Sequence, residues 1–465
     1  MIPPELPLGT QMWQDVRTPT IDAIAKIYEY RRDRTEPAPD TEGTTQSDYK
    51  ALFGRSPNSA SIYRGEELGG LNVLYERVKS LPPIALKFML PDDREEDDPD
   101  FDKVLLHEVA MIPVLLASRY IREHPNEESI NEDDLHRLYL GQESYLVGDD
   151  LRMNVYVPIL GVVIASESEV FDKYSIVELS KKQRALLAKV SFVSPHDAQE
   201  LGAVTHALNF EDVPAYAGGC GLYFAVGPYE ATLDLVNQFF EAACIDSPGA
   251  IGYAQMLFEP VGWFGDMDGD GNTESVHLLR DYATRLDALT LHKAEIGPNE
   301  LSSTNFYFER LSHSHPSLRV AARRLSTARA RSNDEDRIVD LCIGLEALLG
   351  GGSQSGEIIH KISLRAAAML SQSGWGRSVE IMTAMKDLYS YRSRVVHGVP
   401  GPHKKQMLYI DGTPIHASRY ALAALCAVLR ISLQVNGFHP DKVDAMFVYS
   451  VLDSVASQIS TNEQD

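Results

Sequence analysis

One segment near the carboxyl end of the chain, residues 417–435, is apolar on nearly every side when it is drawn as a helix. Such a helix has no face that suits water, so other elements must surround it. The sequence before it predicts four more helices: 316–331, 332–349, 357–370 and 377–397. Because most of the intervening loops are short, we expect a compact all-α bundle over residues 311–465, with 400–417 as its longest interruption.

The ends of these segments carry residues that are typical of helix ends. Pro316 suits a first turn, where its missing N–H is not needed. Ser332 and Glu335 have the spacing of a capping box. Gly398 and Pro400 follow the fourth segment and predict its end.

The amino-terminal part of the chain, residues 1–150, is of mixed type and largely helical. Apolar residues at helical spacing predict a helix over about 104–122. It follows residues 91–102, of which 8 are acidic. This acidic run is interpreted as a solvated loop or as a site for a metal or a basic partner.

The sequence of the middle part, residues 151–310, predicts a mixture of strands and helices. We interpret this part as a sensing or regulatory region. We expect strands within 153–165, 220–227 and 256–264, and helices within 179–190 and 230–244. Pro158 is expected at an edge or a bulge, because proline cannot donate to a sheet ladder. The predicted fold class is therefore α+β, with a mixed amino-terminal and middle region followed by the helical bundle.

The net charge of −23 argues against nucleic-acid binding, since phosphate binding needs Lys and Arg. The charge is unevenly divided, however. Residues 310–435 contain 17 Lys and Arg against 9 Asp and Glu, and the remaining residues contain 26 against 57. A part with a balance of +8 joined to a body with a balance of −31 can still hold a polyanion locally.

The cysteine content indicates a reducing compartment. Cys220, Cys244, Cys342 and Cys426 show no CxxC spacing, which excludes a disulfide scaffold and a cysteine-rich zinc module. The first residues lack the basic and apolar segments of a secretory signal, and no apolar run approaches the roughly 20 residues of a membrane helix. We expect a cytoplasmic protein that does not bind membranes.

A short acidic segment in the middle region resembles the start of a calcium loop. Asp266, Asp268 and Asp270 fall at its first, third and fifth positions, and Gly271 at its sixth. The twelfth position is His277, where a bidentate Glu is needed. An Asp- and Gly-rich turn is the other interpretation, and a metal-dependent enzyme in this region would depend on the three aspartates alone.

The end of the fourth helical segment combines a permanent cation with an imidazole. Arg392 can hold a phosphodiester through two parallel hydrogen bonds. His397 can transfer a proton near neutral pH, and its place at a helix C-terminus favours the imidazolium. Such a pair is the minimum for metal-free RNA cleavage, in which a 2′-hydroxyl attacks its neighbouring phosphate.

Spacing alone leaves a second interpretation open. The same spacing occurs twice elsewhere, at Arg119 with His124 and at Arg310 with His315. Residues five apart on an ideal helix also point about 140° apart. A basic, capped helix end on the surface of the bundle is the alternative to a catalytic site.

The surrounding sequence resembles the HEPN superfamily, and within it the Apea-like HEPN group of prokaryotic anti-phage and toxin systems. The resemblance covers about residues 316–435 and is carried by the strings RIVDLCIGLEALLG, EIIHKISLRAAAML and KDLYSYRSRVVHG, followed by an apolar helix. Many members are metal-independent endoribonucleases whose Arg-x4-6-His motifs face one another across a homodimer, whereas some lack nuclease activity and act as binding modules. The resemblance implies that Arg392 holds phosphate and His397 is the general acid and base. Ser393 departs from the pattern, because Asn, Asp or His often follows the motif arginine.

Further residues could support the motif. Glu346 lies within an otherwise apolar helix and needs a partner if it is buried. We hypothesise that it pairs with Arg392 or Arg394 and orients the motif; a structural ion pair with Arg365 or exposure to solvent are the alternatives. Tyr389 could stack on a base of single-stranded RNA or pack between helices.

These residues together predict an endoribonuclease that cuts single-stranded RNA without a cofactor, as an anti-phage or toxin effector. We expect a homodimer or higher homo-oligomer, with an activator of phage or protein origin. The alternative function is a non-catalytic module that binds a nucleotide, a nucleic acid or a protein partner.

Overall fold

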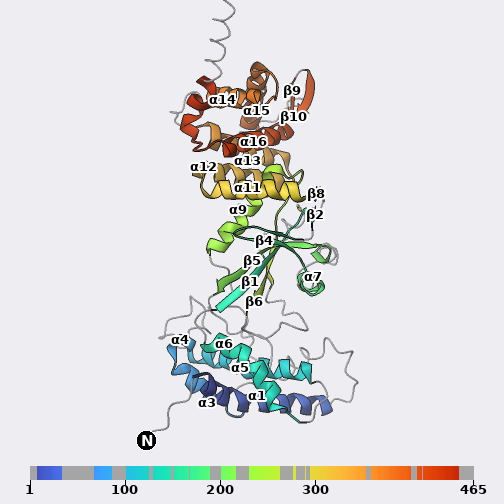
Figure 1. The fold of residues 1–465 in the computed structure, drawn as a ribbon, viewed down its shortest axis with the longest axis vertical. Coiled ribbons are helices and arrows are strands. Elements are labelled where there is room, and N and C mark those ends of the chain that lie inside the picture. The colour runs from blue at the N-terminus through green and yellow to red at the C-terminus, as the bar shows by residue number, and fades with distance from the viewer. Residues whose placement is uncertain are drawn as a thin grey trace, which may run out of the picture.

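The computed structural model describes most of the chain and shows three parts along its long axis (Figure 1). The described residues are 8–33, 68–85, 101–124, 129–147, 151–166, 168–188, 201–215, 230–261, 276–278, 289, 294–351, 358–398, 406–410 and 412–449. A helical unit at one end is followed by a sheet and then by a larger helical part. The α+β class is confirmed at this level.

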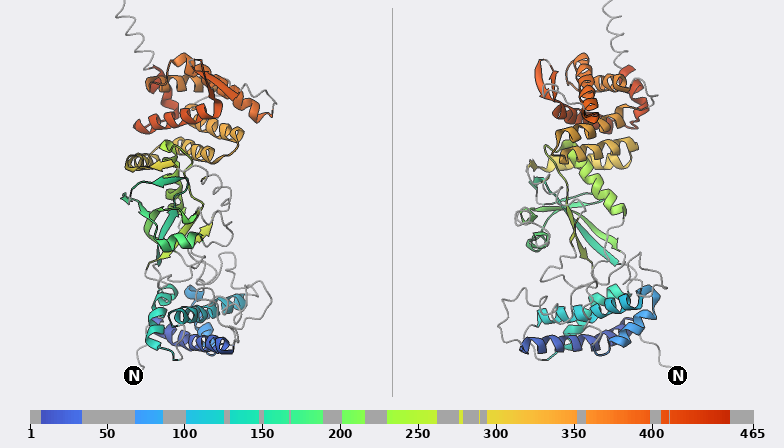
Figure 2. Two further views of the ribbon diagram at one scale, coloured as in Figure 1. Left: turned by 90° about the vertical axis from the view of Figure 1, so that its right-hand side faces the viewer. Right: turned by 180° about the vertical axis from the view of Figure 1, so that it is seen from behind.

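Packed helices form the amino-terminal unit (Figure 2). They are α1 (Leu8–Asp33), α3 (Leu71–Lys79), α4 (Pro82–Ala85), α5 (Phe101–Glu123) and α6 (Glu132–Val147). Residues 102–121 of α5 are long and apolar enough to cross a membrane by length and composition. However, α5 packs against α1, α3 and α6, and its side chains Leu105, Val109 and Ile112 are buried. This is the environment of a core helix in a helical unit.

A six-stranded sheet forms the middle part, in the order β3-β4-β5-β1-β6-β7. Its strands are β1 (Leu151–Pro158), β3 (Glu169–Val170), β4 (Ser175–Glu178), β5 (His206–Ala215), β6 (Gln255–Pro260) and β7 (Val276–Leu278), and a separate parallel pair joins β2 (Val162–Ile164) to β8 (Ala294–Ile296). The edge or bulge predicted for Pro158 is wrong, because β1 is an interior strand and its register shift lies between Met153 and Val155. Pro158 is instead the last residue of β1. Pairing with β6 stops at Tyr156, so the missing N–H removes no bond to that strand.

The two faces of β1 belong to different cores, as strand alternation requires. Met153 and Val155 join the main core, which also contains Phe239 of α9 (Glu230–Asp246). Tyr156 points to the other face and packs with a smaller cluster that includes Leu186 of α7 (Lys181–Ala188). Among the described helices, only α7 contributes to this smaller cluster. It therefore covers part of the outer face of the sheet.

The carboxyl-terminal part is a set of packed helices around a central one. It consists of α11 (Pro298–Ser312), α12 (Pro316–Ala330), α13 (Asp334–Leu349), α14 (Ile358–Gln372), α15 (Ser378–Val396) and α16 (Ala417–Gln434), followed by the short turns η7 (Pro440–Lys442) and η8 (Asp444–Val448). As expected from its apolar surface, α16 contacts α9, α11, α12, α13, α14 and α15. The central position predicted for this helix is confirmed.

The carboxyl-terminal part is not entirely α-helical, which corrects the all-α expectation for 311–465. A hairpin of β9 (Met407–Ile410) and β10 (Thr413–His416) lies within the expected interruption. Ile410 pairs with Thr413, so the turn has two residues, and its second residue, Gly412, has a φ of +75° that only glycine adopts at little cost.

One helix cap and one boundary between regions also differ from the prediction. Asn333, not Ser332, is the N-cap of α13, and its side chain accepts a hydrogen bond from the Glu335 N–H at 2.7 Å. The helix α11 begins at Pro298 and runs through residue 310, the expected end of the middle region, and it packs against α9. The sheet and the bundle therefore share a layer of helices.

A buried carboxyl group lies in the amino-terminal unit. Glu108 of α5 is 8% exposed, and its Oε1 lies 3.7 Å from Nε2 of His107. Burial raises the pKa of Glu108 from 4.5 to about 7 and lowers the pKa of His107. Glu108 therefore binds a proton more readily in the folded state than in the unfolded state.

The substitution Glu108→Gln tests this burial. Between pH 4.5 and 7 the folded wild type holds more protons at Glu108 than the unfolded chain, so this group makes stability fall as the pH rises. We expect Glu108→Gln to raise the free energy of unfolding by about 2 kcal/mol at pH 8 and to change it little at pH 5. Urea denaturation of the full chain, followed by tryptophan fluorescence, measures both values. Equal effects at the two pH values, or an effect as small as that of the exposed Glu29→Gln, would contradict the prediction.

Candidate functional site

The helix α15 presents the predicted motif at its carboxyl end. His397 is the C-cap residue, with φ −89° and ψ 3°, and its N–H donates to the Ser393 carbonyl at 3.1 Å. Gly398 then adopts a φ of +61° and donates to the Val395 carbonyl at 3.2 Å. A side chain would be strained at this left-handed position, so glycine both ends the helix and leaves the His397 side chain exposed.

Arg392 lies one turn earlier and faces α13. Its side chain is 30% exposed, and Nη2 lies 3.9 Å from Oε1 of Glu346. This distance gives an ion pair without a hydrogen bond. The buried Nε of Arg392 has no hydrogen-bond partner among the described residues. The guanidinium is thus held near a carboxylate but keeps unsatisfied donors, and buried donors of this kind favour an incoming acceptor.

Glu346 is half-buried, as the apolar sequence around it suggested. Burial raises its pKa, and the nearby Arg392 partly offsets that rise. One turn earlier, burial raises the pKa of the Cys342 thiol to about 12, which keeps it a neutral packing group. The structure thus places Glu346 beside Arg392, one of the two partners proposed for it, and its role in orienting the motif stays a prediction.

The alternative pairing of Glu346 with Arg365 is wrong, because Arg365 has other partners. It is 1% exposed, and its Nε and Nη2 donate to the two carboxylate oxygens of Asp444 at 2.7 and 2.6 Å. Its Nη1 donates to the carbonyl of Leu349 at 2.7 Å and to those of Gly351 and Pro440 at 3.2 Å. The hydrogen bonds that Arg365 donates to the Asp444 carboxylate lower the pKa of Asp444.

The other predicted supporting residues are not gathered around the motif. Tyr389 is buried and its hydroxyl donates to the Cys342 carbonyl at 3.3 Å, so it packs between helices and is not free to stack on a base. The Arg394 guanidinium lies over the Tyr391 ring, 5.8 Å from its centroid. Ser393 contributes its backbone carbonyl to the helix end. Of the two arginines proposed for Glu346, the structure therefore pairs it with Arg392.

Within one chain, Arg392 and His397 do not meet. Arg392 faces α13, whereas the His397 ring makes no hydrogen bond or ion pair with any residue that the structure describes. Val396 and Tyr409, on α15 and on the neighbouring strand β9, are 50% and 66% exposed. The motif thus ends on a surface that is partly apolar.

The predicted calcium ligands Asp266, Asp268 and Asp270 lie outside the described residues. Among the residues that are described, no group of three or more His, Cys, Asp or Glu side chains could hold a metal ion.

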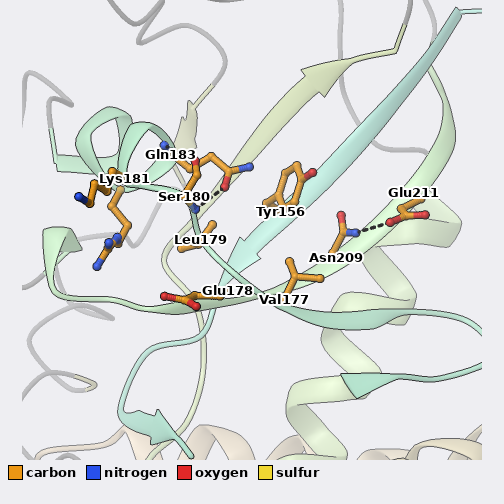
Figure 3. A pocket seen from close by; sticks show the side chains of 10 residues that line it. Tyr156, Val177, Glu178, Leu179, Ser180, Lys181, Gln183, Asn209 and Glu211 are labelled. Carbon is orange, nitrogen blue, oxygen red and sulfur yellow. Dashed lines mark hydrogen bonds between the residues drawn. The ribbon is translucent and has the colours of Figure 1, made fainter. Parts of the chain in front are cut away.

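A second feature, which sequence reasoning missed, is an open hollow of about 450 Å³ on the outer face of the sheet (Figure 3). Its lining comes from β1, β4, β5 and α7. The alternation of polar residues on these strands was the available signal, but pairing of the strands was needed to bring them together.

Comparison with known proteins found no matching family model, no matching curated protein and no matching solved structure.

The ion pair between the buried Arg365 and the partly exposed Asp444 generates a stability prediction. Asp444→Ala leaves the Arg365 cation in the interior without its counter-charge, which costs about 3 kcal/mol. We expect a loss of this size in urea denaturation of the full chain. Asp441→Ala is the matched control, because its carboxylate is 55% exposed and 3.8 Å from His439, and it should change stability by less than about 0.5 kcal/mol. Equal effects of the two variants would contradict the prediction.

Proposed function

We propose that this protein is a metal-independent endoribonuclease of the HEPN type that cuts single-stranded RNA, as an anti-phage or toxin effector in the cytoplasm. The observation that supports this most is the helix end of α15. The buried Nε of Arg392, beside Glu346, has no hydrogen-bond partner in the described part of the chain, and His397 is exposed five residues later. A fixed guanidinium binds phosphate, and an exposed imidazole can transfer protons.

The proposed reaction needs one base and one acid. The base removes the proton of a ribose 2′-hydroxyl, whose oxygen attacks the adjacent phosphorus. The bond from phosphorus to the 5′-oxygen breaks, the acid protonates that oxygen, and a 2′,3′-cyclic phosphate remains. Arg392 neutralises the charge that grows on the phosphate oxygens.

A homodimer or higher homo-oligomer supplies the second imidazole in this proposal. One chain provides one His397, and the ring has no partner among the described residues. Two copies that meet through the surface around Val396 and Tyr409 would bury exposed apolar groups and bring two His397 side chains together. An activator of phage or protein origin would favour this state.

A non-catalytic binding module is the second candidate. It is favoured by the same exposed ring, because no described side chain orients the His397 imidazole as a general base requires. In that case Arg392 binds the phosphate of a nucleotide or nucleic acid without cleavage.

Cleavage of labelled single-stranded RNA by the full chain in excess EDTA tests the proposal. We expect His397→Ala and Arg392→Ala each to reduce the rate at least 100-fold, because proton transfer and phosphate stabilisation contribute at this level. A bell-shaped dependence of the rate on pH is also expected from one acid and one base.

The chain offers matched controls for both variants. His313 is likewise an exposed C-cap residue, at the end of α11, and Arg323 is an exposed arginine of α12. His313→Ala and Arg323→Ala should cleave RNA as the wild type does. No cleavage by the wild type, with or without an extract of phage-infected cells, would favour the binding module. A flat rate between about pH 5.5 and 8.5 would refute the two-histidine mechanism.

Glu346 is proposed as a positioning residue for Arg392. We expect Glu346→Gln to lower kcat/KM about tenfold, equivalent to a loss of about 1.4 kcal/mol, while the Tm stays within about 2 °C of the wild type. In the wild type, burial raises the pKa of Glu346, and protonation of this carboxylate weakens its attraction to Arg392. The rate of the wild type should therefore fall more steeply towards acidic pH than the rate of Glu346→Gln. Glu335→Gln, an exposed substitution on the same helix, is the control. Unchanged kcat/KM in folded Glu346→Gln would exclude the positioning role.

A further inference from the structure

The outer face of the sheet carries a hollow whose lining is mostly polar (Figure 3). Tyr156 of β1 pairs directly with Asn209 of β5, and Asn209 pairs with Ser175 of β4, so three adjacent strands present these residues on one face. The helix α7 borders the hollow with Lys181, Gln183 and Arg184. A volume of about 450 Å³ is in the range of small-molecule sites.

Part of the lining is rigidly held. The Gln183 side chain accepts from the Ser180 N–H at 2.9 Å and donates to Oε1 of Glu259 at 2.9 Å. The Ser180 hydroxyl in turn accepts from the Gln183 N–H at 3.1 Å. These reciprocal bonds fix the first turn of α7 against the sheet.

One polar atom of the lining has no hydrogen-bond partner among the described residues. It is Oδ1 of Asn209, a residue that is 2% exposed and whose Nδ2 makes long bonds of 3.3 Å to Ser175 and 3.2 Å to Glu211. Since Oδ1 is itself buried, a donor in the hollow reaches it only when the amide rotates. A buried unsatisfied acceptor is costly, so it indicates a missing donor.

The charged groups at the rim are also unpaired. The structure gives Glu178, Lys181 and Arg184 no side-chain hydrogen bond or ion pair with another described residue. In Figure 3, Lys181 lies at one end of the hollow and Glu211 at the other, with Glu178 and Tyr156 between them. The cationic end coincides with the N-terminus of α7, which also favours an anion.

We propose that this hollow binds a nucleoside monophosphate whose base carries an exocyclic amino group. The phosphate lies at Lys181 and Arg184, and the amino group donates to Asn209 and Glu211 at the opposite end. The base lies against the Tyr156 ring, since aromatic faces stack on bases. Glu178, between the two ends, accepts from the ribose hydroxyls, the usual role of an acidic side chain beside a nucleotide.

Isothermal titration calorimetry of the full chain with AMP, adenosine and IMP tests this assignment. Adenosine lacks the phosphate, and IMP has an oxygen in place of the amino group. We expect AMP to bind about tenfold more tightly than either, because each lost contact involves a charged or buried partner. The double variant Lys181→Ala/Arg184→Ala should weaken AMP binding about tenfold and leave adenosine unchanged, whereas Asn209→Leu should remove the preference for AMP over IMP.

Two controls make the result specific. Lys182→Ala removes a charge from the same helix outside the lining and should leave AMP affinity unchanged. His397→Ala should bind AMP as the wild type does, which separates this proposal from RNA cleavage. If Asn209→Leu fails to fold, the double variant still tests the proposal, because Lys181 is exposed and Arg184 is only partly buried. No heat with millimolar AMP, equal affinity for the three compounds, or affinity that the double variant does not change would overturn the proposal.

Discussion

The buried guanidinium of Arg365 is the constraint on which the carboxyl-terminal part depends. A cation that is 1% exposed is stable only if every donor is paired, and its partners come from three separate places: the end of α13, the loop after it, and the segment from Pro440 to Asp444. The bidentate bond to Asp444 therefore closes the carboxyl-terminal segment over α14, while the bond to Leu349 places the end of α13. Since α13 carries Glu346 and packs directly against α15, and α14 packs against both helices, Arg365 is one of the contacts that hold the helices around Glu346 and Arg392.

A second set of polar contacts joins the sheet to the bundle. Arg319 of α12 forms two hydrogen bonds of 2.8 Å with Asp234 of α9 and a weaker contact of 3.5 Å with the buried Glu241. Arg430 of α16 donates to Asp246 at the end of α9. Because α9 also contributes Phe239 to the core beneath the sheet, one helix belongs to both parts. The strands that line the hollow and the helix that carries the motif thus contribute to one continuous core, with the hollow in the middle part of the molecule and the motif in the carboxyl-terminal part.

Periodicity and end signals predicted the helices well, because these are local properties of the chain. The apolar surface of 417–435 required a central position, and Gly398 predicted the end of α15. Glu346 was recognised from a charge in an apolar helix, but its partner was not determined, since helix periodicity gives the face and not the neighbour. Arg365 and Asp444 are 79 residues apart, and nothing local links them. The hairpin was missed although Asp411-Gly412 is a strong turn signal, because the flanking strands have only four residues each.

The exposure of His397 decides how the site can work. A general base is effective when another group fixes its ring and when water is excluded, and neither condition is met by the described residues of one chain. Because the His397 ring makes no hydrogen bond to another described residue, no such bond has to break when a second chain or a ligand contacts the imidazole. Arg392 differs in this respect, because Glu346 already lies beside it and its Nε has no acceptor among the residues that the structure describes. In the function proposed above, phosphate binding is therefore prepared within the fold, whereas proton transfer depends on assembly, and the proposal implies that an isolated chain binds RNA before it can cut it.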